Sequence, residues 1–269
     1  MLPRVLSAVA GLSLLLAVTY WGGNLGIVLL ATLIVAICTW EFTQLFSKSL
    51  FSTLLFLIAC MSVFATHVMT PQLTLPVLVG AFLVLSSKGL LLFAHEDTPQ
   101  TYLNIEWTLW GLIYCALLPA LTLQLTLVVG WQLIYFLLIT VFFGDIFALF
   151  SGMIFGGRKI LPKISPKKTV SGAIGGLVGS CLSGVIFVLT TSSIPIDYLQ
   201  WTGICLTIGF FAQAGDFFES MIKRYSGKKD SGKLMPGHGG LLDRVDGVYF
   251  GSIVLYLYSF LIDLHFFFS

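Results

Sequence analysis

Residues 130–155 have the sequence GWQLIYFLLITVFFGDIFALFSGMIF, in which Asp145 is the single charged side chain. About 20 apolar residues in an α-helix span the core of a bilayer, so this stretch is long enough to cross it. The whole chain has the same character, because 57% of its 269 residues are hydrophobic and only 10% are charged. A soluble domain carries about 25% charged residues, and a disordered chain has low hydrophobicity. The composition therefore excludes both classes and indicates a helical membrane protein.

Similar apolar runs, separated by Pro, Gly and polar clusters, recur along the chain. They predict an all-α, polytopic integral membrane protein with about nine transmembrane helices. The expected helices cover about 4–21, 25–46, 50–69, 75–94, 107–127, 130–155, 171–191, 198–224 and 247–267. No long soluble segment interrupts them, so we predict a single membrane domain over residues 1–269. Its N-terminal helices occupy about 1–130, and about 131–269 carries two charged loops, 156–170 and 223–247.

Positive charge is concentrated in these two loops. Of the 14 Lys and Arg residues, eleven lie in residues 158–168 and 223–244. No Lys or Arg residue lies in the connections on the opposite side of the expected helices, at 21–24, 69–74, 128–130 and 192–197. Lys and Arg are enriched in cytoplasmic loops. We therefore expect both loops and the N-terminus in the cytosol, and the C-terminus outside.

The helix expected over 171–191 is rich in small residues. Gly172 and Gly176, and likewise Gly175 and Gly179, are spaced four apart. Such pairs allow helices to approach closely inside a membrane. Close packing is one interpretation, and room for a ligand beside the basic loop is another; the two are compatible.

Several acidic residues lie within expected helices, where an ionisable side chain usually has a function. Asp216 and Glu219 are three residues apart and so share a helix face, whereas Glu41 and Asp145 lie in other helices. The simpler interpretation is an ion pair that ties two helices together. For Glu41 and Asp145 both interpretations stay open.

The run that follows Asp216 combines cations, a flexible turn and acids. Five Lys and Arg residues occupy 223–233, a Pro-Gly-His-Gly-Gly turn follows at 236–240, and Asp243 and Asp246 come next. Ammonium, guanidinium and free backbone N–H groups suit a polyphosphate. Carboxylates suit one only through a divalent metal, and Mg²⁺ is typically held by one or two carboxylates plus substrate phosphates. The run therefore predicts a metal–nucleotide or metal–pyrophosphate site, which a solvated basic loop would not explain.

This run resembles the signature of the phosphatidate cytidylyltransferases, also called CDP-diacylglycerol synthases. It has the form Ser-x-x-Lys-Arg, four residues, Lys-Asp, and then Pro-x-His-Gly-Gly-x-x-Asp-Arg-x-Asp over residues 220–246. Gly-Asp-x-x-Glu-Ser at 215–220 and Ser-Pro-Lys-Lys-Thr at 165–169 are similar to other motifs of that family. Ser171 stands where the family has Glu. The likeness covers about 140–250, and the first 130 residues match in hydropathy alone.

The resemblance implies an Mg²⁺-dependent nucleotidyltransferase of phospholipid biosynthesis in a bacterial plasma membrane, with its active site facing the cytosol. The reaction would convert CTP and phosphatidate into CDP-diacylglycerol and pyrophosphate. Expected partners are CTP, phosphatidate and membrane lipid, with no nucleic acid. A second cation and a homo-oligomer are left open.

The same resemblance assigns roles to individual residues. Asp216 and Asp243 are the leading Mg²⁺ ligands, with Glu219, Asp246 and Asp145 as second candidates. Catalytic and substrate-binding roles, chiefly toward phosphate, fall to Lys223, Arg224, Arg244, Ser165, Lys167, Lys168, Ser220, Lys229, Asp230, His238, Gly239 and Gly240. Within this group, Lys167 and Lys168 are expected on phosphatidate or pyrophosphate, and the later loop on CTP.

Two other functions would use similar features. A CTP-dependent lipid kinase would also bind Mg²⁺ and CTP, and only the signature separates it from a cytidylyltransferase. An ion-coupled transporter also contains intramembrane acids and glycine-rich helices. The sequence disfavours the transporter because the charge lies almost wholly in the second half, without matched repeats.

Overall fold

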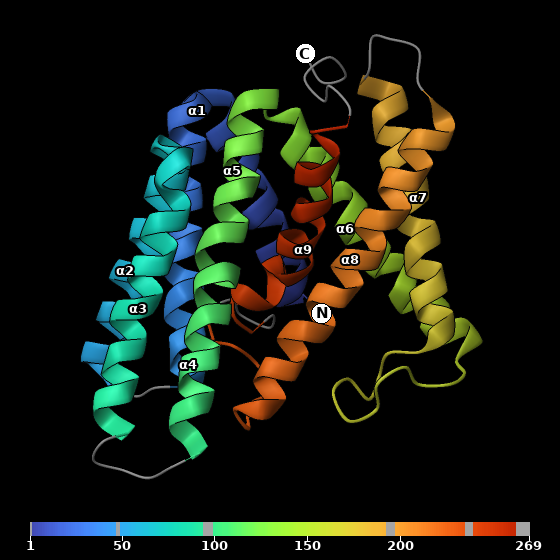
Figure 1. The fold of residues 1–269 in the computed structure, drawn as a ribbon. Helices are drawn as coiled ribbons and strands as arrows, with labels where there is room; N and C mark the ends of the chain where they lie inside the picture. The colour runs from blue at the N-terminus through green and yellow to red at the C-terminus, as the bar shows by residue number, and fades with distance from the viewer. Residues whose placement is uncertain (1, 47–48, 94–98, 192–196, 235–238, 262–269) are drawn as a thin grey trace. The chain divides into compact units, whose positions relative to one another are not determined.

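The computed structural model describes residues 2–46, 49–93, 99–191, 197–234 and 239–261 (Figure 1). Within these ranges the regular structure is helical, and β-type pairing occurs as isolated bridges, such as the one between Lys159 and Thr169. The all-α prediction is therefore confirmed there. The α-helices are α1 (Leu2–Phe46), α2 (Leu50–Met69), α3 (Thr74–Phe93), α4 (Pro99–Leu112), α5 (Leu118–Val129), α6 (Gln132–Phe155), α7 (Val170–Thr191), α8 (Tyr198–Tyr225) and α9 (Leu242–Tyr258). A 3-10 turn, η1 (Pro71–Leu73), precedes α3, and a π-helical segment, η2 (Ile113–Leu117), joins α4 to α5.

Helix α1 contains both of the first two expected helices. Gly23, between them, has φ 53° and ψ −150°, so the helix is kinked there. A positive φ is readily adopted by glycine because it lacks a Cβ atom. The helices expected over 4–21 and 25–46 are thus the two arms of one kinked helix.

By length and composition, five helical segments could cross a bilayer, which supports an integral membrane protein. They are Ala10–Phe46, Leu50–Met69, Glu106–Val129, Gln132–Phe155 and Val170–Thr191. The count of nine is not confirmed. Residues Pro71–Ser87 form a shorter apolar helix, α9 has 17 residues, and the last three turns of α8 carry four charged side chains.

The chain divides into two compact units. The first comprises Met1–Gln124 and Asp230–Leu242. Its core includes Cys38 of α1, Cys60 of α2 and Cys115 of η2, all of them fully buried. The rings of Phe42 and Phe56 stack at 6.0 Å between centroids and fix α1 against α2. The single domain predicted over 1–269 stays a prediction. Its expected division near residue 130 lies close to Gln124, where the first segment of this unit ends.

The second unit comprises Leu125–Lys229 and Asp243–Ser269. Its apolar core is built by α6, α8 and α9, with fully buried Phe136, Trp201 and Ile208 at its centre. Helix α7 packs along α6 and also contacts α8, as Figure 1 shows. These helices hold the segments that carry the charged motifs.

The glycines of α7 bring that helix very close to α6. A Cβ atom at Gly179 would lie 2.5 Å from Cβ of Phe147 and 2.9 Å from the Phe143 carbonyl oxygen. At Gly172 a Cβ atom would lie 2.9 Å from the Ala148 carbonyl oxygen. The prediction of close packing is confirmed, and the space beside these glycines is filled by α6.

Candidate active site

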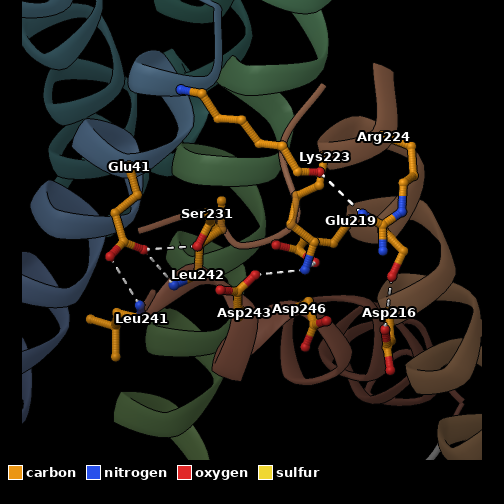
Figure 2. Close-up of polar contacts among 12 residues, drawn as sticks. Glu41, Asp216, Glu219, Lys223, Arg224, Ser231, Leu241, Leu242, Asp243 and Asp246 are labelled. Atoms are coloured by element: carbon orange, nitrogen blue, oxygen red, sulfur yellow. Dashed lines mark hydrogen bonds and ion pairs between the residues drawn. The ribbon is translucent and has the colours of Figure 1, made fainter. Parts of the chain in front are cut away.

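A buried ion-pair group joins the end of α8 to the start of α9. The Lys223 ammonium group pairs with the Glu219 carboxylate one turn earlier and lies 2.6 Å from Oδ1 of Asp243 (Figure 2). The two carboxylates are buried, and the Lys223 side chain is only 11% exposed. One cation therefore faces two acids in a site where water is largely excluded.

Two carboxyl groups share a single ammonium group here. The Glu219 carboxylate forms the ion pair with Lys223 and also interacts with the side chain of Asp243. The Asp246 carboxylate also repels it electrostatically. A buried carboxylate is costly unless a cation or donors compensate it. The arrangement therefore favours binding of a further cation.

A second charged group surrounds Asp216 on α8. Its carboxylate pairs with the ammonium group of Lys168 from loop 156–170, and it accepts a 3.4 Å hydrogen bond from the Ser220 hydroxyl. The same ammonium lies 4.4 Å from the ring centroid of Phe217, within the range of a cation–π contact. Two of the sequence motifs, far apart along the chain, meet at this point.

Three carboxylates of the second unit interact around this pair. Asp145, Asp216 and Asp246 are close enough to repel one another electrostatically. The charges of Lys168 and Arg244 partly offset this repulsion at Asp145, and the charge of Lys223 does so at Asp246. Across the described part of the chain, no three His, Cys, Asp or Glu side chains are already arranged as ligands of one metal ion. Mg²⁺ does not need three, because it keeps waters and shares substrate phosphates.

Loop 156–170 is closed on itself by backbone pairing. The Ile160 amide donates to the Lys168 carbonyl at 3.2 Å, and the Val170 amide donates to the Arg158 carbonyl at 3.0 Å. Ser171, where Glu was expected from the family pattern, donates its hydroxyl to the Gly156 carbonyl. Ser171 therefore fastens the base of the loop from the first turn of α7.

Arg224 connects the two basic segments through backbone oxygens. Its Nε donates to the Ile164 carbonyl at 3.2 Å and its Nη1 to the Lys228 carbonyl at 3.3 Å. A guanidinium group has five N–H donors, so these bonds leave donors for a phosphate. Arg224 thus holds loop 156–170 against the end of α8.

The remaining predicted residues of the second unit lie around these groups. Lys167 and Lys229 have exposed side chains, and the Lys167 carbonyl accepts from Nζ of Lys159 at 3.3 Å. Ser165 is partly buried and Arg244 is exposed on the first turn of α9. These positions are accessible to a charged ligand from water.

The first unit contains a separate polar group built around Glu41. The buried carboxylate accepts a 3.1 Å hydrogen bond from the Leu241 amide, a 2.9 Å bond from the Leu242 amide and a 3.2 Å bond from the Ser231 hydroxyl. Figure 2 shows these three contacts. Among the described residues, no Lys or Arg side chain pairs with Glu41. The ion-pair interpretation is therefore not supported.

The glycine turn next to this group was predicted to bind phosphate. Gly239 has φ 82°, a backbone conformation that favours glycine, and Gly240 is buried. Asp230, at the start of the same segment, is exposed. The prediction for His238 lies outside the described residues. Sequence reasoning placed Glu41 within an expected helix, with an ion pair or a function as its two interpretations, but it missed these partners because they lie about 200 positions away.

Comparison with known proteins places these features in a family. The model of the cytidylyltransferase family matches residues 2–262. The phosphatidate cytidylyltransferase of Brucella abortus biovar 1 is 38% identical over 161 residues, which is 57% of this chain and 57% of that protein. The Thermotoga maritima phosphatidate cytidylyltransferase is 32% identical over 170 residues, 62% of this chain and 63% of the relative. The alignments thus span less than two thirds of these relatives.

Proposed function

Because this chain belongs to the cytidylyltransferase family, we propose that it transfers the cytidylyl group of CTP to phosphatidate, giving CDP-diacylglycerol and pyrophosphate. The observation that carries the proposal is the meeting of three charged segments in the second unit. Lys168 of loop 156–170 pairs with Asp216 of α8, and Lys223 of α8 pairs with Asp243 of α9. Carboxylates that suit Mg²⁺ and cations that suit phosphate therefore lie together there.

In this reaction an oxygen of the phosphatidate phosphate attacks the α-phosphorus of CTP. The bond between the α-phosphorus and the bridging oxygen breaks, and pyrophosphate leaves with that electron pair. The lipid phosphate is already anionic near neutral pH, so no general base is needed. Catalysis then consists of bringing two anionic substrates together and compensating their charge.

Mg²⁺ fits the donor set of this chain, because hard cations prefer carboxylate oxygens. Asp216 and Asp243 are the proposed leading ligands, with Glu219, Asp246 and Asp145 as further candidates. A bound Mg²⁺ would compensate charge on the nucleotide phosphates. The burial of Glu219 and Asp243 around a single cation, Lys223, supports this proposal.

The chain's own cations have a separate task. Lys168 and Lys223 each neutralise a carboxylate in the described structure, so both ammonium groups are already held at the site. We assign Lys223, Arg224, Lys229 and Arg244 to the CTP phosphates. Lys167 and Lys168, in the other loop, are assigned to the lipid phosphate or pyrophosphate.

The proposed setting is the cytosolic face of a bacterial plasma membrane. Five apolar helices support insertion in a bilayer. Both basic loops belong to connections that the distribution of Lys and Arg assigns to the cytosol. CTP would reach the site from water, and phosphatidate from the lipid. Self-association of the chain stays open.

The test uses purified protein in detergent with phosphatidate and Mg²⁺. With CTP labelled at the α-phosphate, label should enter the lipid phase, and with CTP labelled at the γ-phosphate it should not. Reactions without phosphatidate or with EDTA serve as controls. Transfer of γ-label to lipid would instead identify a lipid kinase, and absence of transfer from either label would reject both functions.

A further inference from the structure

We propose that Glu41 is a positioning residue that anchors the segment 231–242, which contains the Gly239–Gly240 turn. The segment's placement then depends on a carboxylate of α1, a helix that bears none of the charged sequence motifs. The anchoring follows from the contacts themselves, whereas its effect on nucleotide binding rests on the proposed function.

The carboxylate holds the segment at both of its ends. Ser231 lies at the beginning, and its hydroxyl donates to Oε2 of Glu41 at 3.2 Å. Leu241 and Leu242 lie at the end, and their amides donate to Oε1 at 3.1 Å and to Oε2 at 2.9 Å. Hydrogen bonds to an ionised acceptor are stronger than neutral ones. One side chain thus contacts both Ser231 and the Leu241–Leu242 backbone.

Two glycines of the segment leave room for this carboxylate. A Cβ atom at Gly240 would lie 2.5 Å from Oε2 of Glu41, and one at Gly232 would lie 2.7 Å from Cδ. Neither glycine has a positive φ. Their lack of a side chain therefore serves close approach to Glu41 and not an unusual backbone conformation. This fit is independent of the hydrogen bonds and indicates a built site.

The anchor also determines which amides remain for a ligand. Helix α9 begins at Leu242, so Glu41 binds the first amide of that helix. Amides at a helix N-terminus attract anions, and here the anion is a side chain of the protein. The Leu241 and Leu242 amides are therefore occupied, and a phosphate at this turn would have to be met by residues preceding Leu241.

Amide hydrogen exchange measures the anchoring without any assay of activity. In the Glu41→Gln variant the side chain keeps its size, but it loses the charge and one acceptor atom. We expect exchange of the amides at 240–242 to accelerate about tenfold, with the α8 peptide 204–215 unchanged. Glu106→Gln, an exposed acid in the same unit, should leave both regions unchanged.

Steady-state kinetics tests the consequence for the nucleotide. Glu41→Gln should raise the apparent KM for CTP about tenfold and leave the KM for phosphatidate within about twofold. Glu41→Asp, which retains the charge, should restore part of the CTP affinity. A residue needed only for stability would lower the fraction of active protein, and hence the apparent kcat, without moving either KM.

Each outcome is decisive. Unchanged exchange at 240–242 in Glu41→Gln would overturn the anchoring, and faster exchange with unchanged KM for CTP would overturn its link to the nucleotide. If the wild-type chain transfers no cytidylyl group, the exchange arm still decides the anchoring, so the two failures are distinguishable. If Glu41→Gln does not fold, Ser231→Ala and Glu41→Asp replace it, and normal exchange in both would reject the proposal.

Discussion

The ammonium group of Lys168 forms an ion pair with the carboxylate of Asp216. This contact joins loop 156–170 to the first charged residue of α8. Lys168 was predicted to meet a lipid phosphate or pyrophosphate, and Asp216 was predicted to bind Mg²⁺. Their pairing places the two expected functions next to each other, and it makes both residues informative targets for mutation.

Lys168→Met should impair activity much more than stability. The paired side chains are 30% and 34% exposed, and a partly exposed ion pair contributes only about 0.2–1 kcal/mol to stability. Loss of one charged contact to a phosphate should lower kcat/KM by roughly ten- to a hundredfold. Detergent-phase thermal unfolding and steady-state kinetics measure the two effects. Lys163→Met, at an exposed lysine of the same loop with no assigned role, is the matched control, and equal loss of activity in both would show that Lys168 has no special role.

Asp216→Asn tests metal ligation. If Asp216 binds Mg²⁺, the amide should reduce turnover below about a tenth of the wild-type rate even at saturating Mg²⁺, while the protein still folds. If Asp216 serves only to hold Lys168, activity should largely survive. Titration of the rate with Mg²⁺ separates the two, and a variant that keeps more than that residual rate would count against ligation.

Lys223→Met should destabilise the protein strongly. The substitution leaves Glu219 and Asp243 buried without their common cation, and breaking a buried pair in this way costs about 3–5 kcal/mol. The double variant Lys223→Met/Glu219→Gln should recover part of the loss, because one uncompensated charge is removed. Thermal unfolding measures both, with the exposed Lys229→Met as control. A small effect of Lys223→Met would mean that water or a cation already compensates the acids.

Gly179→Ala should weaken the packing of α7 on α6. The added methyl group would lie 2.5 Å from Cβ of Phe147, and overpacking of this kind costs about 1–3 kcal/mol. Gly203→Ala is the control, since nothing lies within 4 Å of its Cβ position. Alanine is there expected to stabilise the helix by about 0.5–1 kcal/mol. The unfolding temperatures should therefore shift in opposite directions, and a shared direction would contradict the close-packing account.

The proposed orientation is tested by single cysteines in a background lacking the five native ones. Lys163→Cys, exposed in loop 156–170, should react with an impermeant maleimide only from the cytosolic side. Trp131→Cys, exposed between α5 and α6, should react only from outside. The reverse pattern would place the charged site on the opposite face of the membrane.

The sequence by itself determined the helical membrane class and most helix positions, because apolar runs of bilayer length have few other structures available. It also identified the charged residues of the second unit, since their spacing and chemistry are local. The number of spanning helices is not confirmed. The sequence predicted spans over 198–224 and 247–267, but α8 carries four charged side chains in its last three turns and α9 has 17 residues.

Only the tertiary structure decided which of these groups are partners. Hydropathy cannot show that Lys223 is shared by Glu219 and Asp243, or that Lys168 reaches Asp216. The clearest case is Glu41, whose partners Ser231, Leu241 and Leu242 lie in a distant segment. A buried carboxylate must find donors, and that requirement is visible in the sequence. The identity of the donors is not, because backbone amides are present at nearly every position and only folding selects those that come within reach.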